Sequence, residues 1–157
     1  MIRKIITTPN PILRKRADEI AVVDKKVVQI IYDLKDTLKA SENPKGIGLS
    51  APQIGISKKV LVIKFQGKIL VVINPEIIFA SKETLNDVLP KAKRFLEGCL
   101  SVPGYWGYIN RPYKITTKFQ DLQGNWQEKE FEGKDASLFQ HEFDHLKGIL
   151  FVDRILQ

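Results

Sequence analysis

Hydrophobic residues recur with a helical period in two stretches of the chain. The first begins after Asp24, a residue type favoured at helix N-caps, and has apolar residues at positions 27, 30, 31, 34 and 38. It is expected to end before Asn43-Pro44, because proline disfavours the helical conformation in the residue that precedes it. The second begins near Asp135 and ends at Gly148, with its apolar positions at Leu138, Phe139, Phe143 and Leu146.

Short runs rich in β-branched residues lie between these two helices and predict two hairpins. Val60–Phe65 and Ile69–Ile73 are joined through Gln66-Gly67. Tyr113–Phe119 and Trp126–Phe131 flank a turn that contains a glycine. Consecutive strands with short turns pair antiparallel. We therefore expect an α+β fold, with mostly antiparallel strands packed around the late helix and an amphipathic helix near the N-terminus.

Length and composition agree with one globular unit. The chain has 157 residues, of which 43% are hydrophobic and 27% charged, and neither a linker nor an internal repeat divides it, so residues 1–157 are expected to form a single domain. The segment Thr7–Leu13 carries two prolines and is expected to be extended or turning. No apolar run approaches the roughly 18 residues that a membrane span needs, and no signal-like segment follows Met1.

Charge argues against a dedicated nucleic-acid site, and the cysteine content excludes an intramolecular disulfide. The net charge is +7, but the basic residues are dispersed, and the densest cluster, Arg14–Arg16, is followed at once by Asp18 and Glu19. This distribution favours a solvated basic surface over a dedicated nucleic-acid site. One cysteine and two histidines permit no intramolecular disulfide, and a free thiol fits the reducing cytoplasm. Any metal site with soft ligands must use these three residues.

The segment His141-Glu142-Phe143-Asp144-His145 is an H-E-x-x-H pattern inside the late helix. Residues four apart on a helix share one face, about 5 to 6 Å apart, so both imidazoles can bind one metal ion. Glu142 follows the first histidine, where its carboxylate can act as a general base on a metal-bound water without binding the ion. The pattern therefore predicts a catalytic metal site.

The third protein ligand that such centres normally have is restricted by the sequence. A histidine at the next expected position is excluded because position 151 is phenylalanine, and the only acidic residue after His145 is Asp153. Cys99 is the preferred third ligand, since a thiolate binds iron or zinc well. Asp153 is the weaker alternative.

Two further segments carry motifs that bear on the function. Residues 46–53 are Gly-Ile-Gly-Leu-Ser-Ala-Pro-Gln, and residues 97–101 are Glu-Gly-Cys-Leu-Ser. Together with the His141–His145 segment, in this order and spacing, they resemble the motifs GxGLAAxQ, EGCLS and HExDH of the peptide deformylases. The resemblance runs from Thr8-Pro9-Asn10-Pro11 to Val152-Asp153, nearly the whole chain.

The resemblance implies a role for each matching residue. Cys99, His141 and His145 would be the metal ligands, and Glu142 the general acid and base. The side-chain amide of Gln53 and the backbone N–H of Leu100 would form the oxyanion hole. The pocket for the substrate would be lined by Gly46, Ile47, Gly48 and Leu138.

The implied reaction is the hydrolysis of the N-formyl group from formyl-methionyl nascent peptides, with release of formate. The implied metal is Fe²⁺, which Zn²⁺, Ni²⁺ or Co²⁺ can replace, the implied compartment is the cytoplasm, and the ribosome is a candidate partner. Two alternatives stay open. One is a metallopeptidase that cuts internal peptide bonds, and the other is a non-catalytic, metal-bearing module associated with the ribosome.

This chain departs from the family pattern in four places. Ser50 replaces the usual alanine of the first motif. The charged segment Ser81–Arg94 is longer than expected and is predicted to form a surface loop near the rim of the cleft. Residues Gly104–Tyr108 lack an arginine that many members carry there, which alters the expected contacts at the substrate rim. The chain ends at Gln157 without the C-terminal helix of many bacterial members, so docking through such a helix is not implied.

Overall fold

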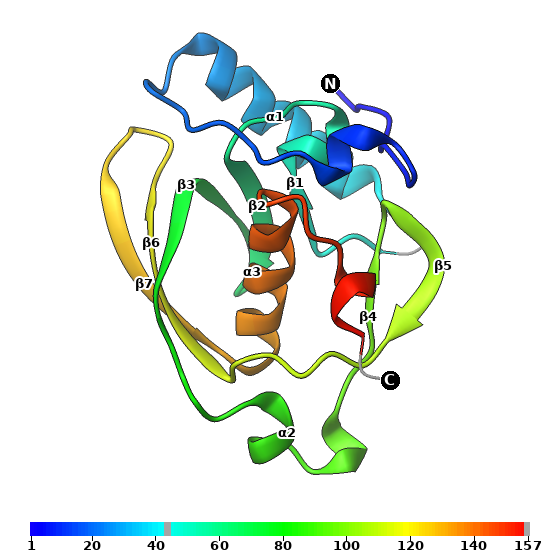
Figure 1. Cartoon of the computed structure of the whole chain (residues 1–157). Helices are drawn as coiled ribbons and strands as arrows, with labels where there is room; N and C mark the ends of the chain where they lie inside the picture. Colours follow the sequence, from blue (N-terminus) through cyan, green and yellow to red (C-terminus); the bar gives the residue numbers. More distant parts are fainter. Residues whose placement is uncertain (43–44, 156–157) are drawn as a thin grey trace.

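Residues 1–42 and 45–155 are described by a computed structural model of the chain (Figure 1). Its helices are α1 (Lys25–Ala40), α2 (Leu85–Val88) and α3 (Gly133–His145). Its strands are β1 (Gly48–Ser50), β2 (Val60–Phe65), β3 (Lys68–Ala80), β4 (Glu97–Cys99), β5 (Val102–Gly107), β6 (Lys114–Gln120) and β7 (Trp126–Glu132). Short 3₁₀ helices cover Pro11–Arg14, Ala51–Ile54, Lys91–Lys93 and Phe151–Arg154. Among the described residues, no helix combines the length and the apolar character needed to cross a bilayer.

The strands form two antiparallel sheets. The larger has the order β1-β2-β3-β6-β7, and the smaller is the pair β4-β5. Both predicted hairpins are present, as β2-β3 and β6-β7. In the first, Gln66 and Gly67 both have positive φ angles, 50° and 76°, as a tight two-residue turn requires. The expected α+β class with mostly antiparallel strands is confirmed.

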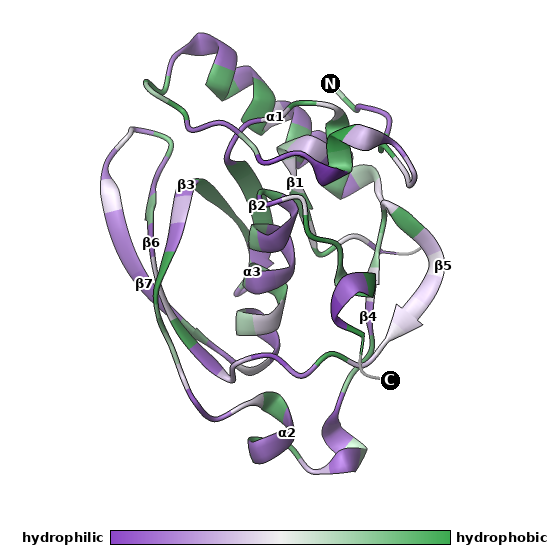
Figure 2. Cartoon of the chain, in the orientation of Figure 1, coloured by the Kyte–Doolittle hydropathy of each residue, from purple (hydrophilic) through white to green (hydrophobic). Residues whose placement is uncertain are grey.

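Strand β2 is the centre of the core because both of its faces are covered. Val60 and Val62 pack into the cluster that contains the buried side of α1, whereas Leu61 and Ile63 pack into the cluster that contains α3. All four side chains are fully buried. A strand covered on both faces is apolar at successive positions rather than at alternate ones, as the hydropathy colouring of β2 shows (Figure 2). Strand β2 therefore holds α1 and α3 on opposite sides of the sheet.

The N-terminal helix follows its predicted pattern. Asp24 caps α1 by accepting a hydrogen bond from the backbone N–H of Val27 at 3.0 Å. Its apolar stripe, represented by Ile31, Leu34 and Leu38, is completely buried. The helix ends at Ala40. The predicted stop signal Asn43-Pro44 lies outside the described residues.

Strand β3 is longer than the predicted strand Ile69–Ile73, because it continues to Ala80 and changes partner from β2 to β6. The sequence obscures this continuation, since Asn74 and Pro75 look like a strand end. Both residues lie at an irregularity in the pairing with β6, where a proline is tolerated. Asn74 adopts a positive φ of 51°, and its side chain bonds to the backbone of Ile20 in both directions at 2.8 Å.

Three other boundaries differ from the predictions. The proline-containing start is not wholly extended, since Pro11–Arg14 forms a 3₁₀ helix capped by the side chain of Asn10. Helix α3 begins at Gly133 rather than near Asp135. The helix ends at His145 rather than at Gly148. Gly148 lies in the turn that follows, with φ 74°, and an added Cβ there would lie only 2.4 Å from the carbonyl oxygen of Arg14.

The charged segment Ser81–Arg94 is more ordered than the predicted surface loop. It contains α2 and the 3₁₀ helix Lys91–Lys93, at the bottom of Figure 1. Leu85 is buried, and its backbone N–H donates to the carbonyl of Arg111 at 2.9 Å. The guanidinium of Arg94 donates back to the carbonyl of Asn86 at 3.3 Å. The first bond attaches the segment to the chain that precedes β6, and the second connects its last residue to α2.

Candidate metal centre

Helix α3 carries both histidines of the H-E-x-x-H pattern on its buried face. The ring centroids of His141 and His145 lie 5.1 Å apart, with an angle of 71° between the planes. His141 is 7% exposed and His145 only 1%. The four-residue spacing therefore brings the two imidazoles together inside the protein, as predicted.

Cys99 at the end of β4 completes a cluster with the two histidines. Its Sγ atom lies 3.3 Å from Nε2 of His145, and one ligand atom from each of the three residues lies within 4.8 Å of the others. A thiolate and two imidazoles suit iron or zinc. Cys99 comes from the small sheet, about 40 residues before the histidines, so only the tertiary fold brings the three together.

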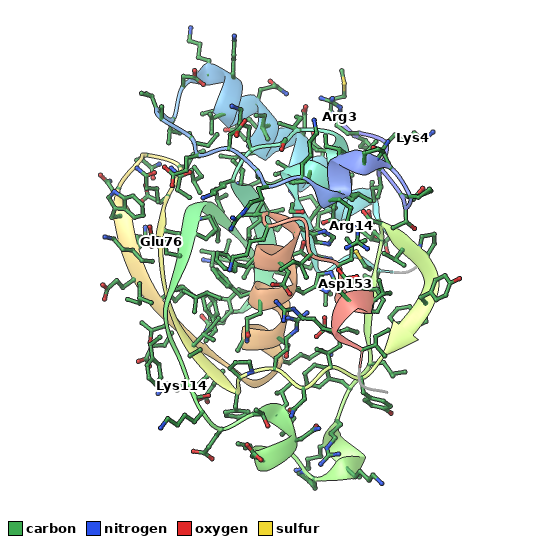
Figure 3. All side chains as sticks on the ribbon, viewed as in Figure 1. Arg3, Lys4, Arg14, Glu76, Lys114 and Asp153 are labelled. Carbon is green, nitrogen blue, oxygen red and sulfur yellow. The ribbon has the colours of Figure 1, made fainter. Side chains whose placement is uncertain are left out.

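Asp153, the weaker alternative ligand, is not part of this cluster. Its carboxylate pairs with the guanidinium of Arg14, with Nη1 and Oδ2 2.5 Å apart, and the two side chains lie side by side in Figure 3. It also accepts a hydrogen bond from the backbone N–H of Leu150 at 3.0 Å. Asp153 therefore caps the 3₁₀ helix that follows α3, and this alternative is wrong.

The hydrogen bonds of His141 test whether the cluster suits a metal ion. Its Nδ1 lies 2.9 Å from Oε1 of Glu97. A carboxylate only accepts, so Nδ1 donates to Glu97, and Nε2 is the ring nitrogen left to bind an ion once it is deprotonated. Ligating histidines in metal sites usually have a carboxylate or carbonyl partner of this kind. The residues present therefore fit a bound metal.

A buried ionic network supports this histidine. Arg111, only 4% exposed, donates to both oxygens of Glu97 at 2.7 and 3.0 Å, and to Asp144 Oδ2 at 3.0 Å. Arg154 donates to both oxygens of Asp144 at 2.7 and 3.1 Å. The sequence analysis assigned these residues no role. For two of them a signal was available, since Glu97 opens the Glu-Gly-Cys segment and Asp144 lies inside the H-E-x-x-H segment, whereas Arg111 and Arg154 lie outside the motifs.

Burial and neighbouring charges shift the pKa values at the centre. Burial lowers the pKa of His145 well below its ordinary value, and the charges of His141 and Arg111 lower it further, so this ring is neutral and able to bind an ion. Burial would also lower the pKa of His141, but its hydrogen bonds to Cys99 and Glu97 and the charges of Glu142 and Cys99 outweigh burial and raise it. An ion that binds Nε2 of His141 must therefore displace a proton. The pKa of Glu97 is lowered, because its bonds to His141 and Arg111 outweigh the opposing effect of burial.

Glu142 lies beside the cluster without belonging to it. Its side chain is 3% exposed, Oε2 is 4.0 Å from Nε2 of His141, and Oε1 has no hydrogen-bond partner among the described residues. Burial, with a smaller effect of the negative charge of Glu97, raises the pKa of Glu142 to about 7. A carboxylate with a pKa near neutrality can both accept and return a proton.

Gly48 leaves room for this carboxylate. An added Cβ would lie 2.8 Å from Oε2 of Glu142 and 3.0 Å from Cδ1 of Leu138. The glycine is therefore required by the close approach of β1 to α3. The resemblance implied that Gly48 lines the substrate pocket, but it gave no packing reason for a glycine at this position.

Gln53 follows β1 and is directed toward Cys99. Its Oε1 accepts from the backbone N–H and the hydroxyl of Ser50, at 2.9 and 3.1 Å, so the amide nitrogen must face the other way. That nitrogen donates to Ser101 Oγ at 3.1 Å and lies 3.5 Å from Sγ of Cys99. Ser50, the departure from the usual alanine, thus helps to fix the orientation of the amide.

These side chains surround one hollow of about 230 Å³. All of the predicted site residues line it except His145, which is almost completely buried. The lining also includes residues that the sequence analysis did not assign: Lys45, Phe95, Leu96, Glu97, Gly98, Trp106, Lys134 and Ser137.

The rim of this hollow differs from the prediction. Within the part of the chain that the structure describes, no residue of Ser81–Arg94 lines the hollow, although Phe95, the next residue along the chain, does. Strand β5, which includes most of the segment Gly104–Tyr108, contributes Trp106 instead of an arginine. The indole packs over Gly98, where an added Cβ would lie 2.3 Å from the ring.

Comparisons with known proteins agree with this site. The family model for polypeptide deformylase matches residues 2–157. The chain is 42% identical to the peptide deformylase of Thermomicrobium roseum, over 98% of this chain and 86% of that protein. It is 41% identical to that of Natranaerobius thermophilus, over 98% of this chain and 92% of that protein.

Solved structures show the same fold. The peptide deformylase from Thermotoga maritima superposes with a TM-score of 0.88 at 37% identity, covering 100% of this chain and 99% of the other. A Plasmodium falciparum peptide deformylase complex with an inhibitor superposes with a TM-score of 0.84 at 37% identity, covering 98% and 90%. A family model over nearly the full length and relatives at about 40% identity leave one assignment: this chain belongs to the peptide deformylase family.

Proposed function

We propose that this chain hydrolyses the N-formyl group of formyl-methionine at the start of nascent polypeptides, releasing formate and a free amino terminus. Family membership supports the reaction. The observation that carries the proposal is that Glu142, the amide of Gln53 and the Cys99 thiol all line one hollow. These groups supply a proton acceptor, a hydrogen-bond donor and a metal ligand around one reacting centre.

Cys99, His141 and His145 would hold the metal, for which we propose Fe²⁺, with Zn²⁺, Ni²⁺ or Co²⁺ able to replace it. A thiolate with two imidazoles is a suitable donor set for each of these ions. When bound, such an ion supplies Lewis-acid polarisation of a carbonyl and activation of water. The protein keeps Nε2 of His141 available through the bond between Nδ1 and Glu97.

Glu142 would move the proton during the reaction. Its carboxylate accepts a proton from the attacking water and later delivers it to the departing amine, which leaves as the free amino terminus. A pKa of about 7 suits both steps, because neither the protonated nor the ionised form is strongly disfavoured near neutral pH. Gly48 leaves the space that this carboxylate occupies, since a Cβ at that position would lie 2.8 Å from Oε2.

Gln53 and Leu100 would stabilise the charge that develops on the formyl oxygen. The side-chain amide of Gln53 is already oriented by Ser50, and the backbone N–H of Leu100 follows directly after Cys99. Fixed donors aimed at a developing oxyanion are worth about 2.7 to 4 kcal/mol each. Gly46, Ile47, Gly48 and Leu138 would contact the substrate beside this centre.

The two alternatives from the sequence are less well supported. A metallopeptidase would cleave unformylated peptides, and the family assignment favours deformylation instead. A non-catalytic module would need neither Glu142 nor Gln53, yet both line the hollow with the cluster. We also propose action in the cytoplasm, where a free Cys99 thiol stays reduced, and near the ribosome, where formylated chains emerge.

The test is turnover of formyl-Met-Ala-Ser by anaerobically purified, iron-loaded protein, followed by detection of the free amine. Glu142→Ala should keep the metal and lose at least about a hundredfold in rate, since general acid-base catalysis contributes that much. Cys99→Ala should lose the metal. Equal turnover by the parent protein and Glu142→Ala would contradict the proposal, as would faster cleavage of the unformylated peptide.

A further inference from the structure

Ser137 has a buried hydroxyl that the proposed chemistry does not use. Its side chain is 2% exposed, and Oγ has no hydrogen-bond partner among the described residues. A serine inside a helix commonly bonds back to a carbonyl of the preceding turn, but this one does not. Ser137 lines the same hollow as Glu142 and His141, so a molecule bound there lies next to the residue whose hydroxyl is unpaired.

The position of Ser137 on α3 relates it to the reacting centre. Ser137 precedes His141 by four residues, which is one turn of helix, and the lining continues another turn back to Lys134 at the exposed end. The hollow therefore extends along α3, away from the cluster and toward solvent. Four residues of helix correspond to about 6 Å.

That distance matches a particular atom of the substrate. In a formylated residue, the formyl carbon is separated by five bonds from the δ atom of the side chain, through N, Cα, Cβ and Cγ. An extended path of five bonds also spans roughly 6 Å, from ordinary bond lengths and angles. With the formyl group at the cluster and the side chain along α3, the δ atom lies level with Ser137. In methionine that atom is the thioether sulfur, a weak hydrogen-bond acceptor.

We propose that Ser137 determines specificity at this site by donating a hydrogen bond to an acceptor at the δ position of the first side chain. This inference rests on the proposed function. The preferred substrates are side chains with the thioether sulfur of methionine or, with a stronger acceptor, the oxygen of methionine sulfoxide. Norleucine has a methylene at that position, so it fills the same space and leaves the hydroxyl unpaired.

The surroundings offer a competing explanation that an experiment can separate. Phe95 also lines the hollow, and sulfur-aromatic contacts favour methionine over norleucine as well. A preference caused by Phe95 would survive the loss of the hydroxyl, whereas one caused by Ser137 would not. The informative quantity is therefore the ratio of kcat/KM for two substrates, compared between variants.

The experiment compares formyl-Met-Ala-Ser, its norleucine analogue and its methionine sulfoxide analogue, with the iron-loaded parent protein, Ser137→Ala and Ser137→Thr. The parent should favour methionine over norleucine by about threefold to tenfold, from the net worth of one hydrogen bond. Ser137→Ala should reduce this ratio to near one and lower sulfoxide turnover more than methionine turnover. Ser137→Thr keeps a hydroxyl and should retain the preference. Ser57→Ala, which removes a partly exposed hydroxyl far from the hollow, is the control and should leave the ratio unchanged.

Three results would overturn the inference: a parent ratio of one, a ratio that Ser137→Ala leaves unchanged, or a Ser137→Thr variant that folds and loses the preference. The parent ratio is informative even if the variants do not fold. If the parent protein turns over none of the formylated peptides, the proposed function itself fails, and this result differs from every one that concerns Ser137.

Discussion

Nδ1 of His141 and Oε1 of Glu97 lie 2.9 Å apart, and this contact connects the strand that carries Cys99 to the helix that carries the two histidines. Glu97 begins the strand that ends at Cys99, while His141 lies on α3. The carboxylate therefore orients one metal ligand while its own strand positions another. Arg111 holds both Glu97 and Asp144, so the same charge network connects β4 to α3.

Glu97→Gln should weaken metal binding by about tenfold to a hundredfold, as is typical for the loss of a partner of a ligating histidine. The amide keeps the size of the side chain but loses the charge that faces both His141 and Arg111. The measurement is metal content after titration with a competing chelator. Glu128→Gln on the exposed face of β7 is the matched control and should bind metal as tightly as the parent. Parent-like affinity in Glu97→Gln would show that the contact is not needed for ligand orientation.

Gly48→Ala should lower kcat by at least about tenfold while metal content stays unchanged. The new methyl group would lie 2.8 Å from Oε2 of Glu142, so the carboxylate must move away from its position. A shift of the proton acceptor by about 1 Å is enough for a loss of this order or larger. Steady-state kinetics and metal analysis test this together. Unchanged kcat would mean that Glu142 does not act from the position seen here.

Substitution of Gln53 should lower kcat more than substitution of Ser50. Gln53→Ala removes the proposed donor and should lower kcat by about a hundredfold or more. Ser50→Ala removes only one of the two bonds to Oε1, because the backbone N–H of residue 50 remains at 2.9 Å, so its loss should stay below about tenfold. Comparison of kcat for the two variants tests the assignment. Equal losses would indicate that Ser50 does more than orient the amide.

Asp153→Asn should destabilise the protein slightly at neutral pH and leave metal content unchanged. The bond to Arg14 holds the pKa of Asp153 below its ordinary value of 3.8, so its contribution is present above that pH and is lost as the pH falls through the lower folded-state pKa. Both side chains are partly exposed, so screening limits the effect to about 1 kcal/mol or less. Urea unfolding at pH 7 and near pH 3 should show a difference that is smaller at the lower pH.

Removal of the metal should lower the thermal unfolding temperature. Binding to the folded state alone adds about 2.7 kcal/mol of stability when free ion is a hundredfold above Kd. Differential scanning calorimetry of metal-free protein, with and without Zn²⁺, measures the shift. Cys99→Ser should strongly reduce this shift in unfolding temperature, because no second cysteine exists to replace the ligand. A full shift in Cys99→Ser would argue that the ion binds elsewhere.

Much of the fold follows from local patterns. Asp24 and the apolar stripe that follows it specify α1, because capping and amphipathic spacing are properties of neighbouring residues. Gln66 and Gly67 specify a tight hairpin for the same reason. The continuation of β3 past Pro75 was not predictable, because a proline inside a strand is tolerated only where the pairing is irregular. That irregularity depends on β6, about 40 residues later.

By itself, the sequence determined the two histidines on one helical face, the carboxylate between them and the single thiol available to complete the set. Residue type and spacing suffice for these, since they depend on one turn of helix and on a count of possible ligands. Only the tertiary structure decided that Cys99 rather than Asp153 joins them, that Glu97 and Arg111 support them, and that the Ser137 hydroxyl lines the same hollow. These contacts join segments that are distant along the chain, so no local pattern of residues specifies them.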